Sequence, residues 1–405
     1  MSVSPLKYAM VHEWLTPMAT GGSELVVEQI LQHIDADLFA LIDFESSNPN
    51  SYLYQRKIES TFLQKFPGAK RGVQKYLPLL PLAIEQLDVR DYDIVLSSSH
   101  AVAKGVLTNA QQMHLCYCHA PMRYAWDLTQ DYLNASRAGR GLPGILTRHL
   151  LHQLRQWDVL SANRVDYFIA NSCTTARRIW RCYRRRAEVI YPPVNVQRFT
   201  QKMSQPSFQK ISPKKKDYYL TVTRLVSYKK VPMMVEAFKQ LGRDFVVIGG
   251  GKALEKLRSQ APANVTLLGE QPDDVVEQYM TGARAFVYGA FEDFGIAPVE
   301  AQAAGIPVIA LNAGGTSETV RDIRQDPKGG TGIHFPQQTV ESLMEAVLAF
   351  EEWEAKFSAE AIAHHAQHFS HDAFALRYLN FLKWAWKDWN HRNQQEFAPP
   401  TLSIP

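Results

Sequence analysis

The chain has little cysteine, no long apolar run and little net charge. Its 405 residues contain only four cysteines and no CxxC pair, so neither a disulfide scaffold nor a zinc site is expected. No window approaches about 18 consecutive apolar residues, so no membrane-spanning helix is expected. Lysine and arginine exceed aspartate and glutamate by only four (44 − 40). This near balance argues against a protein that binds polyanions through bulk charge.

The first residues, MSVSPLKYAMVHEW, lack the basic, apolar and small-residue segments of a secretory signal peptide. Hydrophobic residues make up 46% of the chain and charged residues 21%, which is close to globular averages. At about 150 residues per domain, the length predicts two to three domains. We therefore expect a globular, multi-domain α/β protein that is located in the cytoplasm.

Short β-branched runs alternate with longer stretches of helical periodicity along the first half. The helical pattern is clear at residues 23–33, where apolar residues lie on neighbouring helical rows. The strand-like runs are residues 8–11, 94–97, 114–118, 166–171 and 189–191. Strands separated by helices predict parallel βαβ units. Residues 1–195 are accordingly interpreted as an N-terminal Rossmann-like domain.

The composition changes at residues 195–217, where Gln, Lys, Ser and Pro dominate. We interpret residues 196–217 as a linker, with a surface loop inside one domain as the alternative. The pattern then restarts with strand-like runs at 218–222, 244–248, 265–268, 285–288 and 308–310, and helices at 231–241 and from Pro298. Residues 218–370 are therefore expected to form a second doubly wound sheet domain.

An aromatic stripe at helical spacing, residues 372–389, predicts a long C-terminal helix with Ser370 as its N-cap. We expect this helix, residues 371–392, to pack back on the N-terminal domain. Residues 393–405 are expected to be a flexible tail.

The most specific motif is a pair of glutamates, Glu292 and Glu300, eight positions apart around a glycine loop and a helix start. Gly295 permits close backbone approach, and Pro298 suits the first helical position. The free N–H groups at such a helix start would bind a diphosphate. Glu300 would accept hydrogen bonds from ribose hydroxyls, and Glu292 would contact a sugar hydroxyl. The alternative is an ordinary helix with surface glutamates.

This segment, EDFGIAPVEAQA, resembles the E-x7-E signature of retaining glycosyltransferases with the GT-B fold. It is most similar to the large glycogen-synthase-like family, and within it to bacterial mannosyltransferase-like polysaccharide enzymes. The resemblance implies two Rossmann-like doubly wound parallel-sheet domains that face a cleft. It also implies metal-independent, retaining transfer of a hexose to a saccharide or lipid-linked acceptor. The donor would be GDP-mannose or a UDP-sugar, with no metal or other cofactor.

The resemblance extends to basic residues after the first strand of the second domain. Arg224 and Lys229 fit the family's pair of cations on the donor diphosphate, where two positive charges stabilise the leaving group without a metal. Most members have Gly after that lysine, whereas this chain has Lys230. Phe294, Gly295 and Ile296 would also line the donor site.

In the N-terminal half, His119 follows a strand-like run and matches the histidine that faces the donor sugar in related enzymes. Gly22 resembles part of the glycine-rich loop that approaches the donor phosphate. The expected acceptor-side residues are Gly21, Arg123, Tyr124 and Asp127.

Three other features are open to more than one interpretation. Asp35-Ala-Asp37 and Asp91-Tyr-Asp93 look like DxD metal motifs, but the first is placed at a helix end and the second before a strand, so no metal role is expected. The six arginines between residues 177 and 186 form either a solvated basic face or a contact for anionic lipid head groups or a lipid-linked diphosphate acceptor. Nucleic acid is not expected as a partner, because no matching fold or motif accompanies the arginines. Alternative functions on the same fold are a nucleotide-sugar epimerase or hydrolase and a non-catalytic nucleotide-sugar-binding protein.

Overall fold

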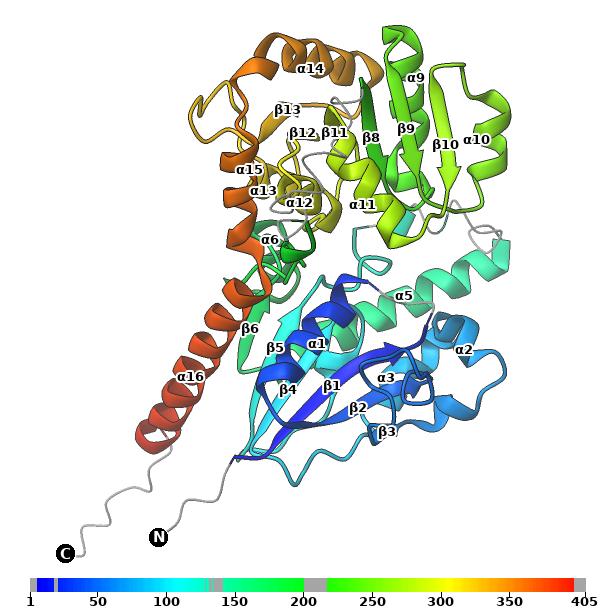
Figure 1. Ribbon diagram of the computed structural model, residues 1–405. Coiled ribbons are helices and arrows are strands. Elements are labelled where there is room, and N and C mark those ends of the chain that lie inside the picture. Colours follow the sequence, from blue (N-terminus) through cyan, green and yellow to red (C-terminus); the bar gives the residue numbers. More distant parts are fainter. Residues whose placement is uncertain are drawn as a thin grey trace, which may run out of the picture. The chain divides into compact units, whose positions relative to one another are not determined.

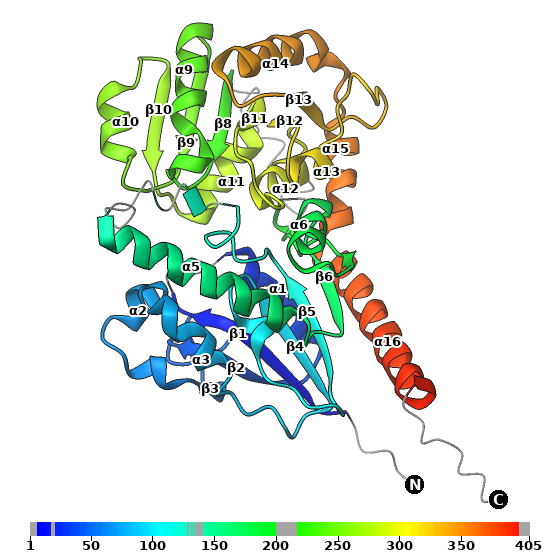
Figure 2. The same ribbon diagram turned by 180° about the vertical axis from the view of Figure 1, so that it is seen from behind.

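The computed structural model describes residues 6–17, 21–127, 129–130, 133, 141–199 and 217–396. The chain divides into two compact units, which are described separately. Unit 1 comprises residues 1–192 and 375–405, and unit 2 comprises residues 193–374. Each unit is a parallel sheet with helices packed on its faces (Figures 1 and 2). The expectation of two Rossmann-like doubly wound sheets is confirmed.

Unit 1 contains a seven-stranded sheet in the order β3-β2-β1-β4-β5-β6-β7, with every pairing parallel. The strands are β1 (Tyr8–Leu15), β2 (Ala36–Asp43), β3 (Ile58–Ser60), β4 (Ile94–Ser99), β5 (Met113–Cys118), β6 (Tyr167–Ala170) and β7 (Ala187–Val189). The helices are α1 (Gly22–His33), α2 (Ala69–Gly72), α3 (Leu80–Ile84), α5 (Gly141–Ala162) and α6 (Cys173–Tyr183). The central strands are buried on both faces, as a sheet covered by helices requires.

Unit 2 contains a six-stranded parallel sheet in the order β10-β9-β8-β11-β12-β13. The strands are β8 (Tyr218–Val222), β9 (Asp244–Ile248), β10 (Val265–Gly269), β11 (Ala285–Tyr288), β12 (Val308–Leu311) and β13 (Gly332–Phe335). The helices are α9 (Val231–Leu241), α10 (Leu254–Gln260), α11 (Asp273–Gly282), α12 (Ile296–Ala303), α13 (Thr316–Thr319), α14 (Val340–Trp353) and α15 (Ala359–Ala366). In both sheets the chain order reverses beside the first strand, at β1/β4 and at β8/β11.

As the sequence predicted, no helix in the described part of the chain is both long enough and apolar enough to span a membrane. Several details of the sequence-based assignment were wrong. Strands β2, β3 and β13 were not predicted, and the strand expected at residues 189–191 is β7 (Ala187–Val189). The helix expected to start at Pro298 begins at Ile296, so the proline is the third helical residue. It is tolerated there because the N–H groups of the first turn have no partner within the helix. The first DxD motif does not close a helix, because Asp37 lies inside β2 and accepts a hydrogen bond from Tyr92 (2.8 Å).

The last helix, α16 (His371–Glu396), begins after Ser370, whose hydroxyl accepts a hydrogen bond from the N–H of Ala373 (3.2 Å). This confirms Ser370 as the N-cap. From residue 375 onward the helix belongs to unit 1, where Tyr167 of β6 donates a hydrogen bond to Asp388 (2.7 Å).

Little of the expected linker is described. Its first residues, 196–199, belong to unit 2, and both Val196 and Phe199 are buried there. Residues 200–216 lie outside the described residues.

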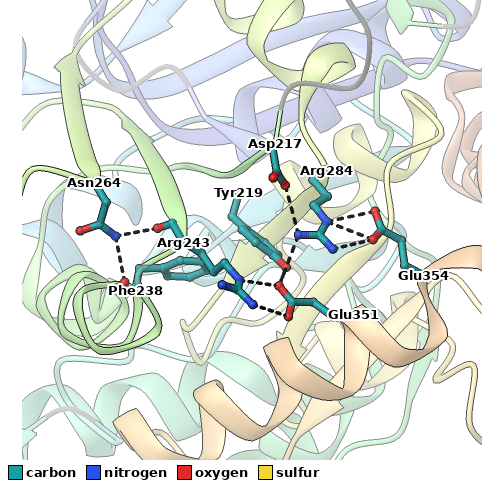
Figure 3. Close-up of polar contacts among 8 residues, drawn as sticks. All are labelled: Asp217, Tyr219, Phe238, Arg243, Asn264, Arg284, Glu351 and Glu354. Carbon is teal, nitrogen blue, oxygen red and sulfur yellow. Dashed lines mark hydrogen bonds and ion pairs between the residues drawn. The ribbon is translucent and has the colours of Figure 1, made fainter.

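At the amino edge of the unit 2 sheet, a network of charged side chains connects the strand starts to the end of α14 (Figure 3). Arg284, just before β11, pairs with Glu354 (2.7 Å) and Glu351 (3.3 Å). Arg243 also pairs with Glu351 (2.9 Å), which accepts a further hydrogen bond from Tyr219 (3.0 Å). These contacts lie at the end of the sheet opposite the carboxyl ends of the strands.

Candidate active site

In open parallel sheets, ligands bind beyond the carboxyl ends of the strands at the point where the strand order reverses. In unit 2 this point lies between β8 and β11. Lys229 follows β8, and Glu292 follows β11. Residues 63 positions apart in the sequence (292 − 229) are therefore brought to one edge by topology alone.

Lys229 and Glu292 form an ion pair, with 2.5 Å between Nζ and Oε1. The hydroxyl of Tyr288, the last residue of β11, donates a hydrogen bond to Glu292 and accepts one from Lys229 Nζ (3.0 Å). The lysine side chain is about nine-tenths buried, so its charge is compensated by the carboxylate rather than by water. Sequence reasoning missed Tyr288; its position at the end of a strand, four residues before Glu292, was the signal available.

Glycines let two loops approach closely beside this cluster. A Cβ on Gly314 would lie 2.1 Å from the carbonyl oxygen of Glu292, and one on Gly315 would lie 2.1 Å from that of Phe294. The Gly315 N–H donates to the Glu292 carbonyl (2.9 Å). Gly295 has φ +88° and precedes the first residue of α12. The loop that carries Glu292 is thus held by backbone packing, and the N–H groups of the α12 start lie beside it.

Glu300 lies on α12 and is partly buried. Burial raises the pKa of its carboxyl group, while the charge of Arg198 acts in the opposite direction. Arg198 is itself paired with Glu277 and Asp273 of α11. Among the described residues no side chain forms a hydrogen bond with Glu300. Its oxygens therefore remain available to hydroxyl groups of a ligand.

The other expected donor residues of unit 2 have different surroundings. Arg224 is exposed, and its contact with the hydroxyl of Tyr228 is long, at 3.4 Å. Phe294 is buried and packs edge-on against Phe369 at 5.7 Å between ring centroids. Ile296 is partly buried at the start of α12. Phe294 therefore acts as a packing residue of this loop in the structure, whereas Arg224 is free to reorient.

In unit 1, His119 directly follows β5. Its ring Nε2 lies 2.8 Å from the hydroxyl oxygen of Ser98, and its backbone N–H donates to the carbonyl of Ser99 (2.8 Å). Burial, together with the nearby His100 and His12, holds the pKa of His119 well below its usual value. The ring is consequently neutral at physiological pH and can exchange hydrogen bonds with hydroxyl groups without a charge penalty.

Sequence reasoning missed Glu13, a fully buried carboxylate of β1 that organises the loop after β4. It accepts hydrogen bonds from the Ser99 hydroxyl and from four successive backbone N–H groups, those of His100, Ala101, Val102 and Ala103. Burial alone would raise the pKa of Glu13, but His100 and these N–H groups outweigh it, and the net shift is downward. No pattern near Glu13 in the sequence indicates these partners, because they lie about 87 positions away.

The glycine pair lies at the start of helix α1, with Gly21 as the N-cap and Gly22 as the first helical residue. In the first turn, Glu24 accepts a hydrogen bond from Ser23 (2.8 Å) and pairs with the buried His12 at 3.7 Å. Burial opposes ionisation of Glu24, but His12 and Ser23 outweigh it and lower its pKa to about 2. Glu24 therefore anchors the start of the helix beside the glycine pair.

The expected acceptor-side residues Arg123, Tyr124 and Asp127 lie in turns after β5. Asp127 pairs with Arg178 of α6 at 2.6 Å. Tyr124 packs against the core cluster of unit 1. Asp127 is thus already engaged by a structural partner on α6.

Sequence comparison identifies two family models along the chain. Residues 20–198 match the model described as Glycosyltransferase Family 4. Residues 204–367 match the model described as Glycosyl transferases group 1. The second match contains Lys229, Tyr288, Glu292 and Glu300, and the first contains Gly22 and His119.

The chain is also similar to curated proteins and to solved structures. It is 26% identical over 380 residues to the alpha-1,3/1,6-mannosyltransferase ALG2 of Kluyveromyces lactis, covering 81% of this chain and 73% of that protein. It is 33% identical over 144 residues to the GDP-mannose-dependent alpha-(1-6)-phosphatidylinositol monomannoside mannosyltransferase of Mycobacterium tuberculosis, covering 31% of this chain and 36% of that protein.

Among solved structures, Anabaena Alr3699/HepE in complex with UDP-glucose superimposes with a TM-score of 0.62 at 18% identity, covering 92% of this chain and 99% of that one. At this identity the likeness concerns the fold. The two glycosyltransferase models together match most of the chain, and its two parallel sheets are those of the GT-B fold. The chain therefore belongs to the glycosyltransferases of the GT-B fold, with residues 204–367 matching group 1.

Proposed function

We propose that the protein is a retaining, metal-independent hexosyltransferase. It moves mannose or glucose from a nucleoside-diphosphate sugar to a saccharide or lipid-linked acceptor in the synthesis of cell-surface polysaccharide or glycolipid. The observation that carries the proposal is the cluster of Lys229, Tyr288 and Glu292 at the strand-order reversal of unit 2. GDP-mannose is the preferred donor. Both relatives described above are named as mannosyltransferases, and the name of the second describes it as GDP-mannose-dependent.

The charged side chains of the candidate site suit the departure of a nucleoside diphosphate. Departure of the nucleoside diphosphate concentrates negative charge on the leaving oxygen, and cations placed there lower the barrier. Lys229 would donate to the diphosphate when the donor displaces Glu292 from its ammonium group, and Arg224 is free to swing to the same phosphates. Glu292, released from the lysine, would accept a hydrogen bond from a sugar hydroxyl. His119 of unit 1 would contact the sugar as a neutral imidazole.

Nucleotide binding tests the proposal directly. In a thermal-shift panel of UDP, GDP, ADP and their sugars, one nucleotide family should raise the melting temperature, because a ligand that binds only the folded state stabilises it. If none does so, the proposed donor class is wrong. Release of nucleoside diphosphate without any acceptor would instead favour a hydrolase.

Glu300→Ala should weaken binding of that nucleotide about tenfold or more, because two ribose hydroxyls lose a charged hydrogen-bond acceptor. Titration calorimetry with the nucleoside diphosphate measures this affinity. Glu318→Ala, a carboxylate of the neighbouring helix α13, serves as the control and should bind like the wild type. Equal affinity in wild type and Glu300→Ala would contradict the ribose assignment.

Transfer activity should persist in excess EDTA, since Lys229 and Arg224 supply the positive charge on the diphosphate. Within the described residues, no group of three or more His, Cys, Asp or Glu side chains is arranged to hold a metal ion. Loss of activity on chelation, with recovery on addition of magnesium or manganese, would refute metal independence. The measurement is sugar transfer with and without the chelator at constant ionic strength.

A further inference from the structure

The ammonium group of Lys229 is enclosed by protein groups on several sides. Its only ion pair among the described residues is with Glu292, at 2.5 Å. It also donates a hydrogen bond to the hydroxyl of Tyr288 (3.0 Å) and lies 5.6 Å and 5.4 Å from the ring centroids of Tyr228 and Tyr288. An ammonium group has three N–H donors. A diphosphate can therefore take only the third donor of Lys229 unless Glu292 moves away.

Both carboxylate oxygens of Glu292 are used in the same cluster. One oxygen faces Lys229, and the other accepts the hydrogen bond from Tyr288. The side chain of Glu292 is 22% exposed and that of Lys229 is 10% exposed. Each charge is thus compensated mainly by the other rather than by water. Separating the two is costly unless each side chain finds a new partner.

The backbone on both sides of this ion pair is held in place. The carbonyl of Glu292 accepts a hydrogen bond from the N–H of Gly315 (2.9 Å), and the N–H of Lys229 donates to the carbonyl of Val226 (3.0 Å). Lys229 also ends a short 3-10 turn two residues before α9 begins. The ion pair therefore opens by rotation of side chains, while the two loops keep their positions.

We propose that the ion pair between Lys229 and Glu292 makes the site select the complete nucleotide sugar over the free nucleoside diphosphate. This selection rests on the proposed function. A nucleotide sugar brings a partner for each charge, because its phosphates accept from Lys229 and a sugar hydroxyl donates to Glu292. A nucleoside diphosphate replaces Glu292 at the lysine but offers the carboxylate no donor, and it adds negative charge beside it.

The same ion pair acts again after transfer, when the sugar has left with the acceptor. Glu292 has then lost its hydroxyl partner and returns to Lys229, where it competes with the phosphates of the product. Re-formation of the ion pair favours dissociation of the nucleoside diphosphate. The enzyme is consequently inhibited less by its own product.

Titration calorimetry tests the proposal with GDP, UDP or ADP, whichever the thermal-shift panel identifies, and with the corresponding nucleotide sugar. Glu292→Gln keeps the shape of the side chain and removes its charge. It should bind the nucleoside diphosphate at least about tenfold more tightly than the wild type, because no anion competes for the lysine. Its affinity for the nucleotide sugar should not rise, because an amide accepts the sugar hydroxyl less strongly than a carboxylate.

Three further variants separate the ion pair from general electrostatics. Glu318→Gln removes one negative charge from the neighbouring helix α13 and should leave both affinities unchanged. Glu292→Asp keeps a carboxylate on a shorter side chain, so it should shift the affinity for the nucleoside diphosphate in the same direction by a smaller factor. It also provides the test if Glu292→Gln does not fold. In a Lys229→Met background, Glu292→Gln should gain much less, because no ammonium group is released.

The possible results separate this selection from the proposed function. Melting temperatures near that of the wild type show that the variants are folded. Equal gains for the nucleoside diphosphate and the nucleotide sugar in Glu292→Gln would overturn the selection, as would an unchanged affinity for the nucleoside diphosphate. In both cases the wild type still binds nucleotide, so the proposed function stands. A wild type that binds no nucleotide refutes the proposed function, and the selection with it.

Discussion

Asp158→Ala is expected to lower the free energy of unfolding by about 3–5 kcal/mol, the usual cost of removing one member of a buried ion pair. Asp158 of α5 and Lys104 are paired, and their side chains are 0% and 1% exposed. Burial alone would lower the pKa of Lys104, but Asp158 outweighs it and the net shift is upward. Without the carboxylate, a charged ammonium group would remain in the core.

Asp158 also joins parts of unit 1 that are distant in sequence. Its second oxygen accepts hydrogen bonds from the indole N–H of Trp126 (2.8 Å) and from the hydroxyl of Tyr183 (2.8 Å). Trp126 belongs to the turns that carry the expected acceptor-side residues, and Tyr183 ends α6. The substitution would therefore leave the donors of Lys104, Trp126 and Tyr183 without this acceptor, which adds to the loss.

Urea denaturation of the variants measures the change in stability. The double variant Lys104→Met/Asp158→Leu should recover much of the loss, because it removes both charges at once. Asp88→Ala is the matched control: its carboxylate pairs with Arg90 on the surface, and the change should be small. An Asp158→Ala protein as stable as Asp88→Ala would show that the buried pair contributes little.

Five of the six strands of unit 2 were predicted from the sequence because each is a short apolar run between turn residues, whereas β13 (Gly332–Phe335) was missed. The structure has β8, α9, β9 and β11 at the expected residues. Strand β2 was missed because Ala36–Asp43 follows α1 with only two residues between and carries an aspartate near its start. A buried strand has no period-two pattern that would separate it from the end of a helix.

A residue of the candidate site was predictable only where it comes soon after a strand in the sequence. Lys229, Glu292 and His119 each lie in the segment that follows a strand. The family motifs that contain them could therefore be placed at the carboxyl ends of the strands. Tyr288 and Glu13 gain their roles from partners on other elements. Such partners are set by the packing of the chain, and a single sequence carries no local sign of them.

Lys229→Met is expected to lower kcat by about 10²–10³-fold, the usual effect of removing one group that stabilises charge in the transition state. The lysine is about nine-tenths buried and preorganised by Glu292 and Tyr288. The exposed Arg224 must first reorient to reach the phosphates, so it should not make up for the loss of Lys229. Tyr288→Phe keeps the ring and removes only the hydroxyl that bonds to both charged groups. The substitution should lower kcat about tenfold with a smaller change in KM, because the hydroxyl group orients Lys229 and Glu292 without binding the donor itself.

Lys230→Met is a closely matched control, since it removes the same charge one position later. Lys230 is exposed and adopts φ +56° just before α9, and methionine changes neither its backbone nor a described ion pair. Its kcat should equal that of the wild type. Steady-state kinetics with the nucleotide sugar identified by thermal shift compares the three variants. If Lys229→Met turns over as fast as Lys230→Met, the diphosphate charge is stabilised elsewhere and the role assigned to Lys229 is wrong. If Tyr288→Phe raises KM and leaves kcat unchanged, its hydroxyl contacts the donor in the ground state instead of positioning the charged pair.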